Sequence, residues 1–121
     1  MSDALPVLTF ESGVLLRQWL ERNHASSDGI WVRIYKRGTG VASVTFEEVL
    51  EQGLCFGWSE SKRRRFDDSS YLQLFARRRT RGTTSTRNRT LADRLLREGK
   101  MTAAGLEALG IGEVSRRPRR G

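Results

Sequence analysis

The chain has 121 residues, enough for one domain with a single hydrophobic core, and its 37% hydrophobic content excludes a disordered polymer. A single cysteine excludes an intramolecular disulfide and favours a reducing compartment. The N-terminus has neither the basic nor the apolar region of a secretory signal, and no apolar run approaches the roughly 20 residues that span a bilayer. The sequence therefore predicts a soluble cytoplasmic protein without a transmembrane segment.

The net charge of +8 is concentrated in the middle of the chain. Residues 1–61 carry 5 basic and 8 acidic side chains, whereas residues 62–89 carry 10 basic and 2 acidic ones. Such a block attracts polyanions such as nucleic acid, phosphorylated ligands or anionic lipid headgroups. The alternative interpretation is an arginine-rich, solvated surface without a ligand.

The first elements follow from helix capping and hydrophobic periodicity. Residues 1–7 are expected to form a flexible lead-in, and residues 8–10 are compatible with a short edge strand. Ser12 is a suitable N-cap for a helix over 13–23, which carries leucine and tryptophan at helical spacing. His24 has no second histidine and no cysteine near it in the sequence, which favours a capping role over a metal ligand or catalytic base.

The segment 30–36 alternates with period 2 and predicts a strand. One face is aliphatic, and the other is aromatic and basic, formed by Trp31, Arg33 and Tyr35. Aromatic rings beside a cation are typical of a platform on which a nucleic-acid base stacks. Ordinary cross-strand packing on a half-buried sheet explains the same residues.

Thr45 and Glu48 form a capping box that predicts a helix over 46–55. Gly57 is suited to the left-handed conformation that ends a helix. Cys55 lies between two apolar residues, which indicates a buried, inert thiol, since reactive thiolates have cationic and partly exposed surroundings.

A hairpin follows, with predicted strands at 58–65 and 71–77. Two basic runs flank the turn of this hairpin at similar sequence distances, and antiparallel pairing is expected to bring them to the same end or the same face of the sheet. The first run is Lys62, Arg63, Arg64 and Arg65, and the second is Arg77, Arg78 and Arg79.

The C-terminal part predicts two helices, over 86–98 and 103–109, the first capped by Ser85, and a disordered basic tail over 113–121. The whole pattern predicts a single α+β domain over residues 8–112. In it, a small antiparallel sheet of about three strands packs against about four helices.

Several motifs resemble the YdeI/OmpD-associated family, also called the OmdA-like or bacteriocin-protection family. They are Leu54-Cys55-Phe56-Gly57-Trp58, the pair Ser85 and Asn88, and Gly99-Lys100-Met101 followed by Gly105. The resemblance covers roughly residues 8–110. It implies a small bacterial cytosolic α+β domain associated with tolerance of bacteriocins, antimicrobial peptides or envelope stress, and it implies no reaction and no catalytic residues.

Two candidate binding sites follow. The first is a surface for an anionic ligand or a protein partner, at which arginine side chains and a helix N-terminus suit a negative group. Its residues are Trp58, Arg77, Arg78, Arg79, Ser85 and Asn88. The second is a nucleic-acid surface made of Trp31, Arg33, Tyr35, Lys62, Arg63, Arg64 and Arg65.

The sequence favours a non-enzymatic binding protein, with a nucleic-acid-binding module as the alternative. An enzyme is the third hypothesis, but Cys55, His24 and Glu60 are too isolated from one another to form a catalytic constellation. We expect no metal and no cofactor, because no ligand spacing for either is present.

Overall fold

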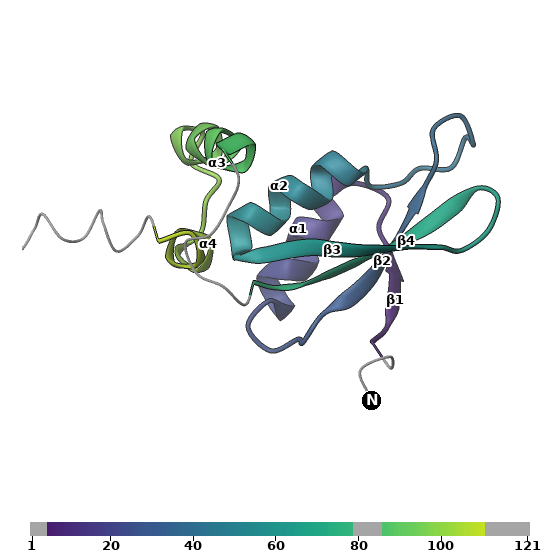
Figure 1. Ribbon diagram of the computed structural model, residues 1–121, viewed down its shortest axis with the longest axis horizontal. Helices are drawn as coiled ribbons and strands as arrows, with labels where there is room; N and C mark the ends of the chain where they lie inside the picture. Colours follow the sequence, from purple (N-terminus) through teal and green to yellow (C-terminus); the bar gives the residue numbers. More distant parts are fainter. Residues whose placement is uncertain (1–4, 79–85, 111–121) are drawn as a thin grey trace, which may run out of the picture.

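The computed structural model describes residues 5–78 and 86–110, which form an α+β fold (Figure 1). The elements in chain order are β1 (Val7–Thr9), α1 (Gly13–Asn23), β2 (Ile30–Tyr35), α2 (Phe46–Phe56), β3 (Trp58–Arg65), β4 (Ser70–Arg77), α3 (Thr86–Arg97) and α4 (Ala103–Ala108). The predicted helices and the three predicted strands are thereby confirmed to within one residue at each end. The predicted tail at 113–121 lies outside the described residues.

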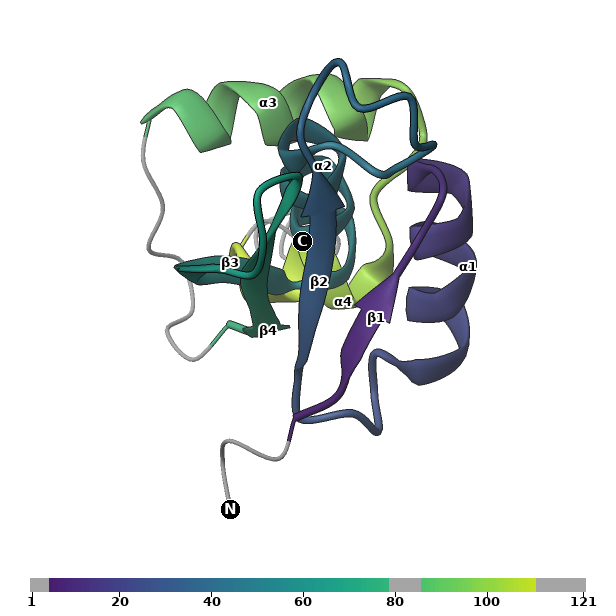
Figure 2. The same ribbon diagram turned by 90° about the vertical axis from the view of Figure 1, so that its right-hand side faces the viewer.

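The described strands form one mixed sheet in the order β1-β2-β4-β3. β2, β4 and β3 pair antiparallel, but β1 pairs parallel with β2 through the crossover helix α1, which lies beside them (Figure 2). The prediction of an antiparallel sheet of about three strands is therefore wrong. β1 has only three residues, two of them exposed, so its sequence pattern is too short to predict pairing with a strand beyond the helix.

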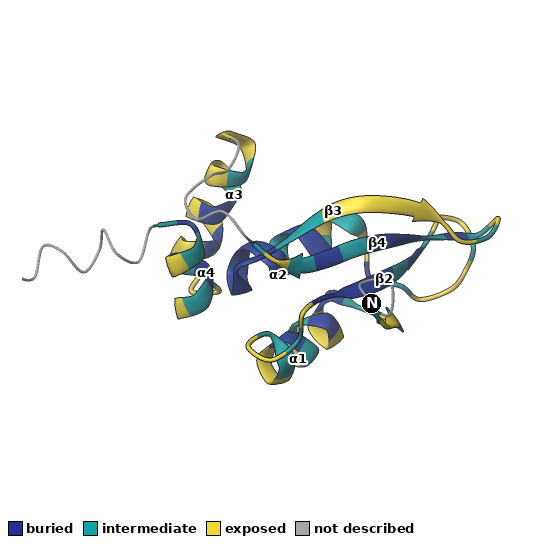
Figure 3. Cartoon of the chain, turned by 60° about the horizontal axis from the view of Figure 1, so that its bottom comes forward, coloured by how far each residue is buried: buried dark blue, intermediate teal, exposed yellow. Residues whose placement is uncertain are grey.

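The helices cover one face of the sheet, and the core lies between the two layers. The aliphatic face of β2 predicted from alternation is buried there, with Ile30, Val32 and Ile34 in the core cluster. Trp58, at the start of β3, is 1% exposed, and its ring lies 5.1 Å from the Phe75 ring of β4. Figure 3 shows the contrast along β3, which is buried where it begins, then half-buried, and exposed from Ser61 to its end.

The helix caps predicted at Ser12, Thr45 and Gly57 are present, whereas the cap predicted at Ser85 lies outside the described residues. The Leu15 amide donates to Ser12 Oγ at 3.3 Å at the start of α1. At the start of α2 the capping box is complete, since the Glu48 amide donates to Thr45 Oγ1 and the Thr45 amide donates to Glu48 Oε1. Gly57 ends α2 in the left-handed conformation, with φ of 77°. These caps are local, so they fix the helix boundaries without tertiary information.

A β-bulge interrupts the pairing of β3 with β4. Between Glu60 and Arg63 the register shifts, so that β3 has one residue more than β4. The buried side chain of Gln73 donates from Nε2 to the Lys62 carbonyl at 2.9 Å, which satisfies a backbone acceptor within the bulge. The extra residue reverses the alternation of β3, and Arg64 therefore lies on the face of the sheet opposite the helices.

A candidate anion-binding groove on the outer face of the sheet

A groove of about 640 Å³ lies on the face of the sheet opposite the helices, hereafter the outer groove. Trp31 of β2 pairs with Leu74 of β4, so their side chains lie on the same face and form the apolar floor together with Ala76. The complete lining is Leu5, Asp28, Trp31, Ser59, Ser61, Lys62, Arg64, Leu74, Ala76 and Arg77. The groove therefore combines an apolar floor with a polar, largely basic rim, as small-molecule sites commonly do.

Three basic side chains, Lys62, Arg64 and Arg77, line the outer groove, against one carboxylate, that of Asp28. Arg77 Nη2 lies 3.9 Å from Asp28 Oδ1, a long ion pair between exposed side chains. Within the described part of the chain, Lys62 and Arg64 have no carboxylate at ion-pair distance. The excess positive charge favours an anion in the groove.

The Arg64 guanidinium covers the floor of the outer groove. Its Cζ lies 4.6 Å from the centroid of the Trp31 ring, in cation–π geometry. Trp31 is only 8% exposed, although it lies on the face of the sheet opposite the described helices. The indole predicted as part of a stacking platform is thus present on the open face, but it is stacked with arginine.

Arg33, on the same face, is held by its own network. Its Nη2 donates to Asp67 Oδ2 and its Nε to Ser70 Oγ, both at 2.9 Å. Its guanidinium also lies over the rings of Tyr35 and Phe66, 4.6 and 4.4 Å from their centroids. These contacts fix Arg33 and Tyr35 to the hairpin loop, so both act in packing at this end of the sheet.

Asp67 is the acceptor that organises this loop. Ser70 Oγ donates to its Oδ1 at 2.8 Å, and the amide and hydroxyl of Ser69 donate to the same oxygen. The hydrogen bond from the Ser70 hydroxyl, together with those from Ser69, lowers the pKa of Asp67 to about 2. Asp67 is therefore ionised at neutral pH and available to pair with Arg33.

The first basic run is divided between the two faces of the sheet. Arg63 lies on the helix side, over the rings of Tyr71 at 4.4 Å and Phe46 at 5.3 Å. Arg65 pairs with Asp68 of the hairpin loop at 2.7 Å. The predicted nucleic-acid set therefore does not form one surface, because strand alternation separates Arg63 and Arg65 from Arg64.

The predicted set around the second basic run is only partly brought together. Arg77 and Arg78 line a hollow of about 350 Å³ with His24 and Glu107, where the C-terminal ends of α1 and α2 and the helix α4 lie near the end of β4. The side chain of Trp58 is buried in the core and does not reach this surface. Asn88 is half-buried in the first turns of α3, and Arg79 and Ser85 lie outside the described residues.

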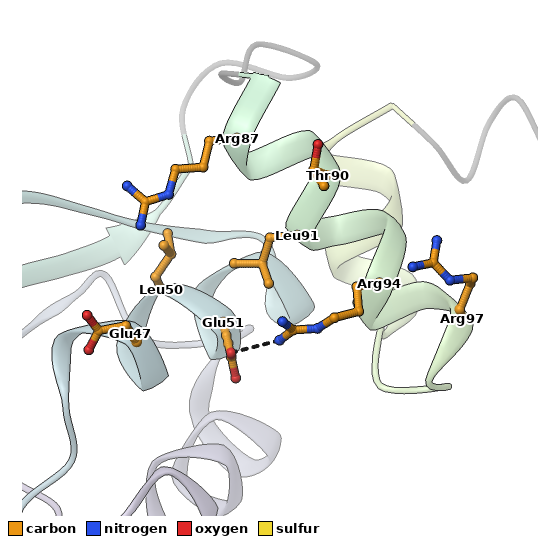
Figure 4. A pocket seen from close by; sticks show the side chains of 8 residues that line it. All are labelled: Glu47, Leu50, Glu51, Arg87, Thr90, Leu91, Arg94 and Arg97. Carbon is orange, nitrogen blue, oxygen red and sulfur yellow. Dashed lines mark hydrogen bonds and ion pairs between the residues drawn. The ribbon is translucent and has the colours of Figure 1, made fainter.

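A second groove separates α2 from α3 (Figure 4). Leu50 and Leu91 form its apolar part, and Arg94 of α3 reaches across to Glu51 of α2, with Nη2 2.9 Å from Oε2. Arg94, the arginine best placed in this groove, is already paired with a carboxylate. The groove is therefore less suited to bind an anion than the outer groove is.

The groups considered for catalysis are placed in structural roles. The Cys55 thiol is fully buried, and burial raises its pKa, so the reactive thiolate is disfavoured. His24 caps α1, with its Nδ1 2.8 Å from the Leu20 carbonyl oxygen. Among residues 5–78 and 86–110, no group of three or more histidine, cysteine, aspartate or glutamate residues is arranged to hold a metal ion.

Sequence reasoning missed six residues of the outer groove, namely Leu5, Asp28, Ser59, Ser61, Leu74 and Ala76. Period-2 alternation along β4 puts Leu74 and Ala76 on one strand face, but only the register between β2 and β4 shows that this face is also that of Trp31. Asp28 lies in a connection between elements, where no periodicity applies.

The chain belongs to the family described as a domain of unknown function (DUF8412), whose model matches residues 8–108. No curated protein and no solved structure matches the chain. The resemblance to the YdeI/OmpD-associated family therefore stays a prediction. In the described part of the chain, none of the helices has the length and apolar character needed to cross a bilayer.

Proposed function

We propose that this protein is a cytoplasmic, non-enzymatic binding protein that recognises an anionic ligand or the anionic group of a partner at the outer groove. The observation that carries the proposal is the lining of that groove, in which three basic side chains from two strands face one carboxylate above an apolar floor. Arginine and lysine bind phosphate and carboxylate groups through charge-assisted hydrogen bonds.

The biological role that fits this proposal is the one implied by the family resemblance, which is tolerance of bacteriocins, antimicrobial peptides or envelope stress. The placement of Cys55 and His24 in structural positions supports binding over catalysis.

The test is a calorimetric titration of the native protein with pyrophosphate, compared with Arg64→Ala and Arg77→Ala. Each substitution is expected to weaken binding about tenfold or more, since a hydrogen bond to a charged group contributes roughly 1.5–3 kcal/mol. Arg22→Ala is the matched control, because Arg22 is exposed in α1 and lines none of the grooves described above. Equal effects at all three positions, or no binding to the native protein, would contradict the proposal.

A nucleic-acid-binding module is the second candidate. It is supported by Lys62 and Arg64, which pair with no carboxylate of the described residues and line the outer groove with the Trp31 ring. For single-stranded oligonucleotides this function requires that log affinity fall with log salt by roughly 0.7 per phosphate contact. Fluorescence anisotropy across a salt series measures the slope, and affinity that does not change with salt would exclude this candidate.

A further inference from the structure

We propose that Arg64 is a displaceable cover on Trp31, and that the anion bound in the outer groove carries a planar ring, as a nucleotide does. This inference rests on the proposed anion-binding function and adds the chemical class of the ligand. It begins from the floor of the groove, where the Trp31 ring, Leu74 and Ala76 form an apolar surface beneath basic side chains.

The two arginines of the outer face differ in how they are held. Arg33 is fixed by a carboxylate at 2.9 Å, a hydroxyl at 2.9 Å and two rings. Arg64 is exposed, lies on the edge strand directly after the bulge, and contacts the Trp31 ring without a carboxylate partner in the described residues. Its charge is therefore uncompensated, and only a cation–π contact retains it over the indole.

An anion at the rim gives the Arg64 guanidinium a second interaction that competes with its contact to the Trp31 ring. A charge-assisted hydrogen bond to phosphate is stronger than a cation–π contact at an exposed site, so the guanidinium is expected to move from the ring toward the anion. Lys62 and Arg77 are positioned on the same rim to bind the phosphate with it. This movement uncovers the flat face of Trp31.

The uncovered indole requires a replacement, because leaving it in water would expose apolar surface. A planar ring attached to the phosphate fills the place of the guanidinium, which is itself planar, and bases stack on tryptophan independently of their identity. The cavity of about 640 Å³ lies within the range that holds a small ligand. The chemistry of the groove thus fits a ring-bearing phosphate ester rather than a bare anion.

The experiment compares adenosine 5′-monophosphate with ribose 5-phosphate, which lacks the planar adenine base, by calorimetric titration of the full chain. The nucleotide is expected to bind about tenfold more tightly to the native protein. In Trp31→Leu the ratio of the two affinities should fall to about one, while in Arg64→Ala both affinities fall and the ratio rises, because the ring is already uncovered. Tyr71→Leu is the control, since Tyr71 carries a comparable arginine stack on the opposite face of the sheet.

Equal affinity for the two compounds in the native protein overturns the ring inference and leaves the anion-binding function intact. Binding of neither compound overturns both. If Trp31→Leu fails to fold, Trp31→Phe takes its place; it retains an aromatic ring and is expected to keep a preference for the nucleotide. The ratios of the two affinities in the native protein and in Arg64→Ala then remain decisive. A single-stranded oligoadenylate identifies the source of the nucleotide, because affinity well above that of the monomer at low salt indicates nucleic acid and equal affinity indicates a free nucleotide.

Discussion

At the scale of single residues, the outer face of the sheet is stabilised by polar side chains that are mutually satisfied. Asp67 accepts hydrogen bonds from two serines of its own loop and pairs with Arg33 of a different strand. The loop conformation and the position of Arg33 therefore depend on one carboxylate. This contrasts with Arg64, which has no such carboxylate among the described residues and is free to serve a ligand.

The ionisation of Asp67 is expected to contribute to acid stability. Its pKa is about 2 in the folded protein, below the ordinary value of 3.8, so the stabilisation is complete above about pH 4 and is lost as the pH falls toward 2. Side-chain NMR titration of Ser70→Ala should show the pKa of Asp67 moved up toward 3.8, because the largest contribution comes from that hydroxyl. An unchanged pKa in Ser70→Ala would show that the hydroxyl is not the cause.

Gly105 is expected to be intolerant of any side chain. It is buried in α4, and a Cβ there would overlap the backbone carbonyls of Leu54 and Cys55 in α2. Backbone atoms within a helix do not move aside easily, so Gly105→Ala should lower the free energy of unfolding by roughly 1–3 kcal/mol in urea denaturation. Ala103→Ser, at an exposed position of the same helix, should change it by no more than about 0.5 kcal/mol. Equal effects would mean that α4 shifts freely on α2.

At the scale of elements, the bulge in β3 determines which arginine faces the groove. Strict alternation from Trp58 would place Arg64 on the helix side, and the extra residue between Glu60 and Arg63 places it over Trp31 instead. The Gln73 amide holds this irregularity by binding the Lys62 carbonyl from the core side. A buried polar residue in β4 therefore controls the chemistry of the opposite face.

Gln73→Met tests this control. The substitution keeps the length of the side chain but removes the donor to the Lys62 carbonyl, so stability should fall by about 1–2 kcal/mol. The backbone amide shifts of Ser61 and Lys62 should also change, and pyrophosphate binding should weaken if Arg64 is displaced. Gln18→Met, on the exposed side of α1, is the control and should leave all three measurements as in the wild type. If stability falls by the expected amount but the amide shifts of Ser61 and Lys62 stay unchanged, Gln73 does not hold the bulge in place.

How much of the molecule could be predicted from its sequence depends on whether a feature is set by local residues or by pairing between distant segments. The helices were predictable because their caps are local, as Ser12, Thr45 and Gly57 show. The pairing of β1 and the outer groove were not predictable. They depend on pairing between segments far apart in the chain and on a bulge that no local sequence pattern indicates. Trp58 was expected at a binding surface from its neighbours in sequence, whereas its side chain, at the buried start of the edge strand β3, lies in the core.

At the scale of the whole molecule, one run of the positive charge lies on an edge strand. β3 is the last strand of the sheet, and residues 61–66 are exposed, with four of these six being lysine or arginine. Charged side chains on an edge strand prevent two sheets from pairing through their free backbone groups. The basic run thus has two physical roles, attracting an anion to the outer groove and keeping the edge from associating with another chain.

The second role leads to a prediction about self-association. Lys62→Thr combined with Arg64→Thr replaces two edge charges with a residue of high strand propensity, so this variant is expected to form larger species than the wild type as the protein concentration rises. Size-exclusion chromatography with light scattering measures the change. Arg87→Thr combined with Arg97→Thr is the matched control, because it removes the same charge from α3 and leaves the edge strand intact. Association of both variants to the same extent would show that net charge, rather than the edge, keeps the chains apart, and association of neither would show that the edge needs no charged side chains.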